Sequence, residues 1–294
     1  MPQGRIWFIT GASSGLGLQL ALTASQHGDT VIATSRDPSK LAPLAEQNPL
    51  IIPKPLDPAT ASPDTLTTLI DEITTAHGPI DILVNNAGYI LEGAIEECTD
   101  AELEAQFAVN VFSPVRVIRA VAPSMRARSA GIIANIGSIG GWNGSPSAGF
   151  YCASKAAVGV YTEALKAELA PFGVDVTCIE PGYFRTGFLT SGHKVSAGKR
   201  IPELDVATRG MREALEAYSL KQPGDPVKGA QVMYEALTKT GRFEVLREEG
   251  RHLPARLALG KDALDAIGGS LQREREMLDT WGGVVGETDC ADVQ

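Results

Sequence analysis

The chain has 294 residues, 44% of them hydrophobic, which is enough for a substantial core in one large domain or two small ones. Its net charge of −9 and the lack of a basic stripe exclude the usual features of a nucleic-acid-binding protein. Four scattered cysteines without a C-x-x-C pair predict a reducing, cytoplasmic compartment, and together with four isolated histidines they predict no metal site. The N-terminus has no basic segment followed by a long apolar run, so we expect no signal peptide, and without an apolar run of about 18 residues we expect no membrane span.

The first predicted elements are a strand and a helix joined by a glycine-rich turn. Residues 5–9 are apolar apart from Arg5, as in a buried strand, and the apolar spacing after Gly17 predicts a helix that ends near Gly28. Residues 10–17 between them read T-G-x-x-x-G-x-G. Glycine permits the close approach of a ligand, and the free N–H groups at a helix start suit a pyrophosphate. An ordinary glycine-rich turn is the alternative.

A second strand is predicted at 30–34, and the residues at its end bear on the choice of dinucleotide. A carboxylate there binds the ribose hydroxyls of NAD, whereas an arginine accommodates the 2′-phosphate of NADP. Asp37 lies 20 residues beyond Gly17, at the spacing of an NAD marker, but Arg36 stands directly before it. A solvated turn formed by these two residues is also compatible with the sequence.

Two further strands are predicted at 50–56 and 80–84, with a helix at 65–77 between them. The first contains two prolines, which makes it short or places it near an edge, and it ends at Asp57, a residue that can cap the following turn. The second runs into the sequence N-N-A-G at 85–88, where amide side chains can tie strand ends together and small residues leave room for a cofactor's ribose. An asparagine-rich turn without a ligand is the alternative.

A long helix is predicted over 99–128. A capping box formed by Thr99 and Glu102 opens it, and Pro114 is expected to kink it. Asn110 lies among its apolar residues, and a buried amide needs hydrogen-bond partners. A structural asparagine is therefore one interpretation of this position.

The pair Tyr151 and Lys155 carries the strongest chemical signal. A fifth strand at 131–136 ends next to Ser138, which stands 13 residues before Tyr151, and the pair lies four residues apart on one face of the following helix. A free tyrosine has a pKa of about 10. A neighbouring ammonium favours the tyrosinate, so we expect Lys155 to lower the pKa of Tyr151 toward neutrality. An exposed helical pair is the alternative.

The C-terminal part has weaker signals. After a sixth strand come a Pro181-Gly182 bend and Thr186, whose hydroxyl can cap the next helix. Leu257 and Leu259 are assigned to a helical apolar stripe. The predicted elements are a strand at 174–179, a mobile lid at 187–224, a helix at 226–240, a last strand at 243–246, and one or two helices over 253–281.

Together these motifs resemble the short-chain dehydrogenase/reductase family over about residues 5–186. The resemblance implies a catalytic tetrad of Asn110, Ser138, Tyr151 and Lys155, in which the tyrosine transfers a proton, the lysine also binds the cofactor ribose, and the asparagine holds a water beside the lysine. One departure is Gly137, where many members of the family carry serine.

The resemblance also implies how the cofactor is held. In the family the acid that selects NAD falls at the position of Ser35, so Ser35 followed by Arg36 favours NADP over NAD. Asp57 is implied to bind the adenine, and Thr186 to reach the nicotinamide amide or the phosphates. The implied cofactor-binding positions are Thr10, Gly11, Ser13, Ser14, Gly15, Leu16, Gly17, Ser35, Arg36, Asp57, Asn86, Ala87, Gly88, Tyr151, Lys155, Pro181, Gly182 and Thr186.

We therefore predict an α/β protein with a doubly wound parallel sheet of the Rossmann type. It forms a single domain over 1–294, with a cofactor-binding and catalytic core at 5–186, a substrate lid at 187–224 and a C-terminal helical extension at 250–294. The predicted activity is NADP(H)-dependent interconversion of a ketone or aldehyde and its alcohol on a medium-sized, partly apolar small molecule.

Two alternatives stay open, an NAD-dependent alcohol dehydrogenase of the same fold and a non-catalytic dinucleotide sensor or partner-binding protein. A homo-oligomer is also possible by resemblance. The expected pocket walls are Tyr89, Ile90, Trp142, Phe150, Phe184, Phe188 and Leu189.

Overall fold

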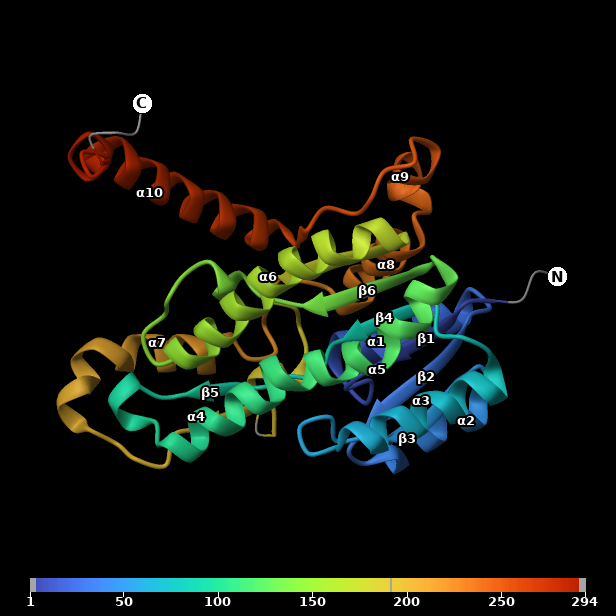
Figure 1. Ribbon diagram of the computed structural model, residues 1–294. Helices are drawn as coiled ribbons and strands as arrows, with labels where there is room; N and C mark the ends of the chain where they lie inside the picture. Colours follow the sequence, from blue (N-terminus) through green and yellow to red (C-terminus); the bar gives the residue numbers. More distant parts are fainter. Residues whose placement is uncertain (1–3, 191, 291–294) are drawn as a thin grey trace.

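A seven-stranded parallel sheet forms the centre of the computed structural model, which describes residues 4–190 and 192–290 (Figure 1). The strand order is β3-β2-β1-β4-β6-β7-β9. The strands are β1 (Ile6–Ile9), β2 (Thr30–Ser35), β3 (Ile51–Pro55), β4 (Ile82–Asn85), β6 (Gly131–Ile136), β7 (Val174–Pro181) and β9 (Arg256–Leu259). As the two prolines of β3 predict, this strand lies at an edge of the sheet.

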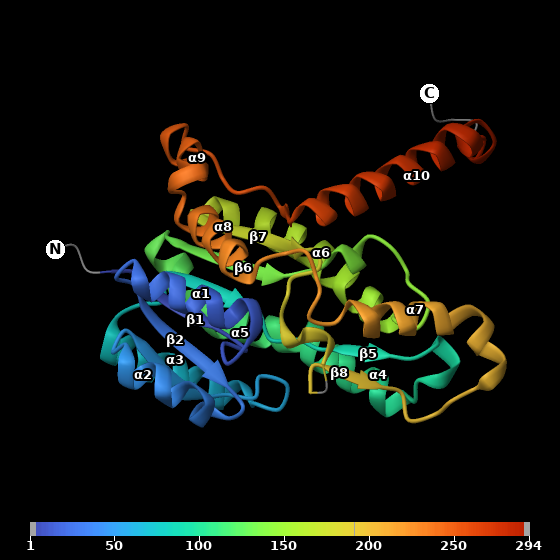
Figure 2. The same cartoon turned by 180° about the vertical axis from the view of Figure 1, so that it is seen from behind.

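Helices cover both faces of the sheet because successive strand residues point to opposite sides. From β1, Trp7 and Ile9 pack into the core under one set of helices, and Phe8 packs into the core under the other. The first set contains α1 (Gly15–Gln26) and α8 (Pro226–Thr238) (Figure 2), and the second contains α3 (Pro63–His77), α5 (Ser113–Arg128) and α6 (Gly149–Leu169). The doubly wound Rossmann-type sheet is thus confirmed.

The strand order reverses between β1 and β4, and this reversal indicates where a ligand would bind. The chain moves outward from β1 to β2 and β3, then returns to β4 on the other side of β1. In such sheets ligands bind at the carboxyl ends of the strands where the order reverses. The glycine-rich turn follows β1, and the N-N-A-G segment begins at the last residue of β4.

The predicted long helix is divided by one wide turn. It consists of α4 (Asp100–Phe107), a π-helical turn (Ala108–Phe112) and α5, and the predicted capping box at its start is present. Pro114 has no N–H to donate to the carbonyl of Asn110, and its ring crowds that carbonyl. The expected kink at Pro114 therefore takes the form of a π turn that contains Asn110.

Two predictions at the C-terminus were wrong. Residues 243–246 do not form a strand, because a 3-10 turn and α9 (Glu244–Glu248) occupy this segment. The last strand of the sheet is β9, so Leu257 and Leu259 belong to a strand and not to a helical stripe. Pairing of β9 with the edge of β7 outweighs the local helical spacing.

Several smaller elements complete the fold, and the sequence did not indicate all of them. A second small parallel sheet joins β5 (Ile90–Glu92) to β8 (Lys194–Ser196), and α7 (Asp205–Tyr218) contains the predicted helical spacing. A short helix, α2 (Ala42–Gln47), precedes β3. The last helix, α10 (Lys261–Val285), rises away from the sheet in both views (Figures 1 and 2). Within residues 4–190 and 192–290, no helix has the length and apolarity to span a membrane.

Candidate active site

The glycine-rich turn has the backbone that its sequence predicts. Gly11 has a φ of +65°, and a side chain there would lie 2.9 Å from the Cα of Ala87. Ser14, the N-cap of α1, makes no capping bond with its side chain, and the first turn of α1 contains no acidic residue. The positive end of this helix is therefore available for an anion.

Thr10 and Asn86 lock the turn against the end of β4. The Thr10 hydroxyl accepts hydrogen bonds from the backbone N–H of Asn86 at 3.0 Å and of Ala87 at 3.1 Å. The Asn86 amide donates to the carbonyls of Thr10 and Gly11, both at 3.0 Å. The expectation that asparagine side chains tie the strand ends together is confirmed for this pair of strands.

A cavity of about 950 Å³ brings most of the predicted site residues together. Three of them do not line it: Thr10, Gly17 and Asn110 lie behind its wall. The predicted residues that do line it are Gly11, Ser13, Ser14, Gly15, Leu16, Ser35, Arg36, Asp57, Asn86, Ala87, Gly88, Ser138, Tyr151, Lys155, Pro181, Gly182 and Thr186.

One end of the cavity, next to the end of β2, has exposed positive charges. Arg36 and Lys40 line it, and neither forms a salt bridge with a residue in the described ranges. The carboxylate of Asp37 accepts a hydrogen bond from the backbone N–H of Ser39 at 3.1 Å, and hydrogen bonding from Ser39 lowers the pKa of Asp37. The Asp37 carboxylate is therefore hydrogen-bonded within its own turn.

Asp57 and Thr186 each cap a turn and also line the cavity. Asp57 accepts a hydrogen bond from the N–H of Ala59 at 3.1 Å, and Thr186 accepts one from Phe188 at 3.3 Å, so both act as caps. Both also line the cavity. Thr186 reaches the glycine-rich turn, where a side chain on Gly15 would contact it at 3.7 Å.

Lys155 is held inside the cavity wall. It is 5% exposed, and its ammonium donates a hydrogen bond to the carbonyl of Ile136 at 2.7 Å. Its Nζ lies 6.0 Å from the centroid of the Tyr151 ring. Burial lowers the pKa of Lys155 to about 8.

The expected lowering of the pKa of Tyr151 was wrong. Burial raises the pKa of this phenol above its ordinary value, and the neighbouring Ser138 hydroxyl opposes that rise only in part. Removing the phenol from water disfavours its charged form, and that effect is larger here than the attraction expected from Lys155. Tyr151 is therefore a protonated phenol at neutral pH.

Asn110 supports the cavity from behind. Its carbonyl oxygen accepts from the N–H of Tyr89 at 3.1 Å, and its amide donates to the carbonyl of Tyr89 at 3.0 Å and to the hydroxyl of Ser154 at 3.1 Å. A side chain on Gly88 would lie 3.3 Å from the Asn110 carbonyl oxygen and 3.6 Å from the Lys155 Nζ. The π turn thus directs Asn110 toward the space that Lys155 also faces.

Glu180 accounts for two departures from expectation. A side chain on Gly137 would meet the Cys178 sulfur at 2.6 Å and the Glu180 Cγ at 3.0 Å, so the serine common in the resembling family has no room here. Trp142 donates its indole N–H to the Glu180 carboxylate at 2.8 Å and stacks on Arg256. Contrary to expectation, neither Trp142 nor Phe150 lines the cavity.

The other expected pocket walls do line the cavity: Tyr89, Ile90, Phe184, Phe188 and Leu189.

The C-terminal extension holds the bend after β7. The N–H of Gly182 donates to the carbonyl of Leu259 at 2.9 Å, and that of Tyr183 donates to the carboxylate of Asp262, the second residue of α10, at 2.7 Å. A side chain on Gly182 would overlap Asp262. The sequence did not indicate that this extension shapes the site.

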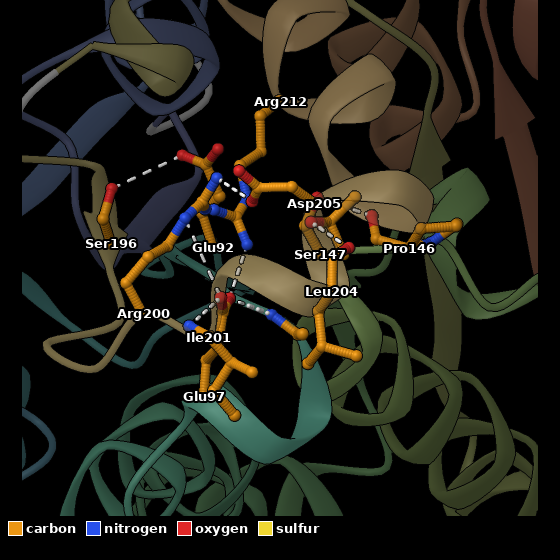
Figure 3. Close-up of polar contacts among 12 residues, drawn as sticks. Glu92, Glu97, Pro146, Ser147, Ser196, Arg200, Ile201, Leu204, Asp205 and Arg212 are labelled. Carbon is orange, nitrogen blue, oxygen red and sulfur yellow. Dashed lines mark hydrogen bonds and ion pairs between the residues drawn. The ribbon is translucent and has the colours of Figure 1, made fainter.

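Buried carboxylates fasten segment 187–224 to the body. Glu97 accepts hydrogen bonds from the N–H of Ile201 at 3.0 Å and of Ala94 at 2.9 Å, and it pairs with Arg212, as Figure 3 shows. Burial by itself would raise the pKa of Glu97, but these N–H groups and the charge of Arg200 hold it below its ordinary value. In β5, Glu92 forms a second ion pair with Lys194 of β8.

Several cavity-lining residues were not singled out from the sequence, and most of them lie in or near this segment, where no motif marks them. His193 had been assigned an isolated position, yet it contacts the Ser14 hydroxyl at 3.2 Å. Burial and the charges of Arg36 and Lys40 lower the pKa of His193. Further examples are Tyr183, Met211, Leu215 and Gln222, and, in the loop after Ser138, Asn143 and Ser145.

The site has the features that a dinucleotide needs. The open start of α1, the crowded glycine at position 11 and the positive charges at one end match a long anionic cofactor. Among residues 4–190 and 192–290, no three histidine, cysteine or acidic side chains gather as metal ligands would.

Comparisons with known proteins agree with this geometry. The short chain dehydrogenase family model matches residues 5–194. The chain is 33% identical to Oxidoreductase BOA17 of Botryotinia fuckeliana over 270 residues, 90% of this chain and 92% of that protein. The crystal structure of a short-chain dehydrogenase from Streptomyces avermitilis is 36% identical, with a TM-score of 0.86 over 98% of this chain and all of the other.

A second solved structure carries a cofactor. Gluconate 5-dehydrogenase from Burkholderia cenocepacia, in complex with NADP and tartrate, is 32% identical, with a TM-score of 0.60 over 64% of this chain and 75% of the other. The sheet, the glycine-rich turn, the Tyr151–Lys155 pair and these likenesses lead to one conclusion: the chain belongs to the short-chain dehydrogenase family of oxidoreductases.

Proposed function

We propose that the chain is an NADP(H)-dependent reductase that interconverts a ketone or aldehyde and the corresponding alcohol. The observation that carries this proposal is that Ser138, Tyr151 and Lys155 line the same cavity as the glycine-rich turn, with Lys155 buried. In this proposal residues 5–186 are the catalytic core and segment 187–224 is the substrate lid.

The preference for NADP rests on the end of β2. Arg36 and Lys40 offer positive charge to a 2′-phosphate, while Asp37 is engaged with Ser39 and Ser35 stands where an acid would otherwise select NAD. The gluconate 5-dehydrogenase relative, which binds NADP, supports the same assignment.

Bound NADPH would supply a hydride to the carbonyl carbon. Tyr151 then donates its proton to the carbonyl oxygen as negative charge develops there, and Ser138 donates a hydrogen bond to the same oxygen. Lys155 places a positive charge beside the phenol, which favours the tyrosinate left after proton transfer. Asn110 fixes the backbone of Tyr89 and faces the Lys155 ammonium across Gly88.

The test is a panel of ketones and aldehydes with NADPH consumption as the readout. We expect turnover by the native protein, and we expect Tyr151→Phe to keep its affinity for NADPH while its turnover drops at least a hundredfold. Tighter binding of NADH than of NADPH would favour the NAD-linked alternative. Binding of NADPH without oxidation by any carbonyl would favour a dinucleotide sensor.

Association with a second copy and a cytoplasmic location complete the proposal. The helix α10 exposes Leu271, Leu278 and Trp281, and exposed apolar groups of this size often mark contact surfaces. Light scattering of the purified protein would measure the mass of the assembly directly.

A further inference from the structure

Gln222 has a buried side chain that faces the cavity. It lies between α7 and α8, is 1% exposed and contributes to the cavity wall. The motif residues of the family do not include it, and the mechanism above does not use it.

The backbone around Gln222 is held firmly. The guanidinium of Arg185 donates to the carbonyl of Gln222 at 3.0 Å. Two residues on, Gly224 donates to the carbonyl of Tyr183 at 3.0 Å and accepts from the N–H of Arg185 at 2.8 Å. A side chain on Gly224 would lie 2.8 Å from Phe184, so the two segments are in close contact. Gln222 is thereby fixed beside the residues that directly follow the Pro181-Gly182 bend.

The Gln222 amide has no protein partner. Its Oε1 is buried and accepts no hydrogen bond from any residue in the described ranges, and the side chain donates none to them. Buried amides in folded proteins are almost always hydrogen-bonded. An amide that is positioned by its backbone, buried and unpaired at a cavity wall is arranged for a partner that enters the cavity.

The charges around the cavity restrict the nature of that partner. The lysine and arginine side chains that line it are Arg36 and Lys40 at the β2 end and Lys155 in the catalytic group. From the segments next to Gln222 the lining residues are Tyr183, Phe184, Met211 and Leu215, which are uncharged. Arg185, whose guanidinium holds the backbone carbonyl of Gln222, does not line the cavity, so an anionic group at this end would find no cation on the wall and would meet the carbonyl oxygen of the amide.

We propose that Gln222 recognises the substrate, which is an uncharged, mainly apolar carbonyl compound with a second neutral hydrogen-bond donor, a hydroxyl or an amide N–H. The donor pairs with the Gln222 Oε1 while the carbonyl oxygen faces Tyr151. The assignment rests on the proposed reductase function and narrows its substrate class. Because a hydroxyl or an amide can also accept, it satisfies the N–H groups of the same side chain.

The test uses pairs of ketones that share a carbon skeleton and differ by a distal hydroxyl or primary amide. With NADPH consumption as the readout, the native protein should show a kcat/KM roughly 10- to 100-fold higher for the member that carries the donor. Gln222→Leu should remove that preference, so that the kcat/KM values for the two members of each pair lie within about threefold of each other, since only the donor-bearing substrates lose a hydrogen bond.

Two controls keep the result interpretable. Gln231→Leu removes an amide from α8 that bonds Glu235 at 3.0 Å outside the cavity, and it should leave the preference unchanged. Gln222→Met keeps the length of the side chain. It replaces Gln222→Leu if the latter no longer binds NADPH or no longer unfolds in a cooperative thermal transition.

The inference fails if the native protein reduces both members of every pair equally, or if Gln222→Leu lowers activity equally on both. Water would then be the partner of the amide. In that outcome NADPH oxidation persists, so the reductase function stands. If no carbonyl compound oxidises NADPH, the proposed function fails and the substrate assignment fails with it.

Discussion

Replacing Glu180 by glutamine tests whether one buried ion pair holds the end of the sheet to the loop after Ser138. Glu180 is 1% exposed and accepts hydrogen bonds from the Nε and Nη2 of Arg256 at 2.9 and 2.6 Å and from Trp142 at 2.8 Å. The Arg256 guanidinium lies 3.9 Å from the centroid of the Trp142 ring. One carboxylate therefore connects β7, β9 and the loop that follows β6.

Glu180→Gln keeps the volume of the side chain but leaves the Arg256 charge without its main partner. Breaking a buried pair in this way costs about 3–5 kcal/mol in the free energy of unfolding. Arg256 has an 18% exposed side chain and keeps Glu163 at 3.5 Å, so we expect a loss near the lower end, about 3 kcal/mol. The side chain of Glu163 is 47% exposed, and Glu163→Gln should cost less than about 1 kcal/mol.

Urea unfolding of the two variants beside the native protein measures this difference. The midpoint for Glu180→Gln should fall while the m-value stays unchanged, and its Tm should drop by roughly 6–12 °C. Such a comparison resolves differences of about 0.5 kcal/mol. If the free energies of unfolding of Glu180→Gln and Glu163→Gln differ by less than that, burial of the pair does not stabilise this junction and the reasoning is refuted.

Three further predictions follow from the site. Gly137→Ser should destabilise the protein by about 1–3 kcal/mol, because the added side chain overpacks against Cys178. Adding Cys178→Ala should recover part of that loss in the same urea unfolding assay. An unchanged unfolding midpoint for Gly137→Ser would contradict the crowding. Glu97→Gln should speed hydrogen exchange of segment 187–224 while the amides of the seven-stranded sheet keep their rates, and equal effects on both would show that Glu97 acts on global stability. The affinity for NADPH should weaken above pH 8, because burial lowers the pKa of Lys155 to about 8 and the side chain then loses its proton. Lys155→Met should bind NADPH more weakly than the native protein at pH 7 and should lose this pH dependence. A native affinity that stays constant from pH 7 to 9 would contradict the prediction.

The sequence by itself determined the parts of the protein whose signals are local. The T-G-x-x-x-G-x-G turn, the N-N-A-G segment and the capping box at Thr99 each involve residues close together in the chain, and their structures follow from backbone conformation and helix capping. Short apolar runs in the sequence predict the buried strands. The resemblance to a known family that these motifs carry, and not the local features alone, predicted that Ser138, Tyr151 and Lys155 act together with the glycine-rich turn, and the structure places all three in one cavity with that turn.

Tertiary structure decided whatever depends on residues far apart in the chain. Strands β5 and β8 have three residues each and exist because they pair with one another, and β9 became a strand because the edge of β7 was available. Gly137 is explained only by the side chains of Cys178 and Glu180, which the fold brings against it. The pKa of Tyr151 rises because packing around the phenol reduces its contact with water, and the spacing of Tyr151 and Lys155 in the sequence does not predict this effect.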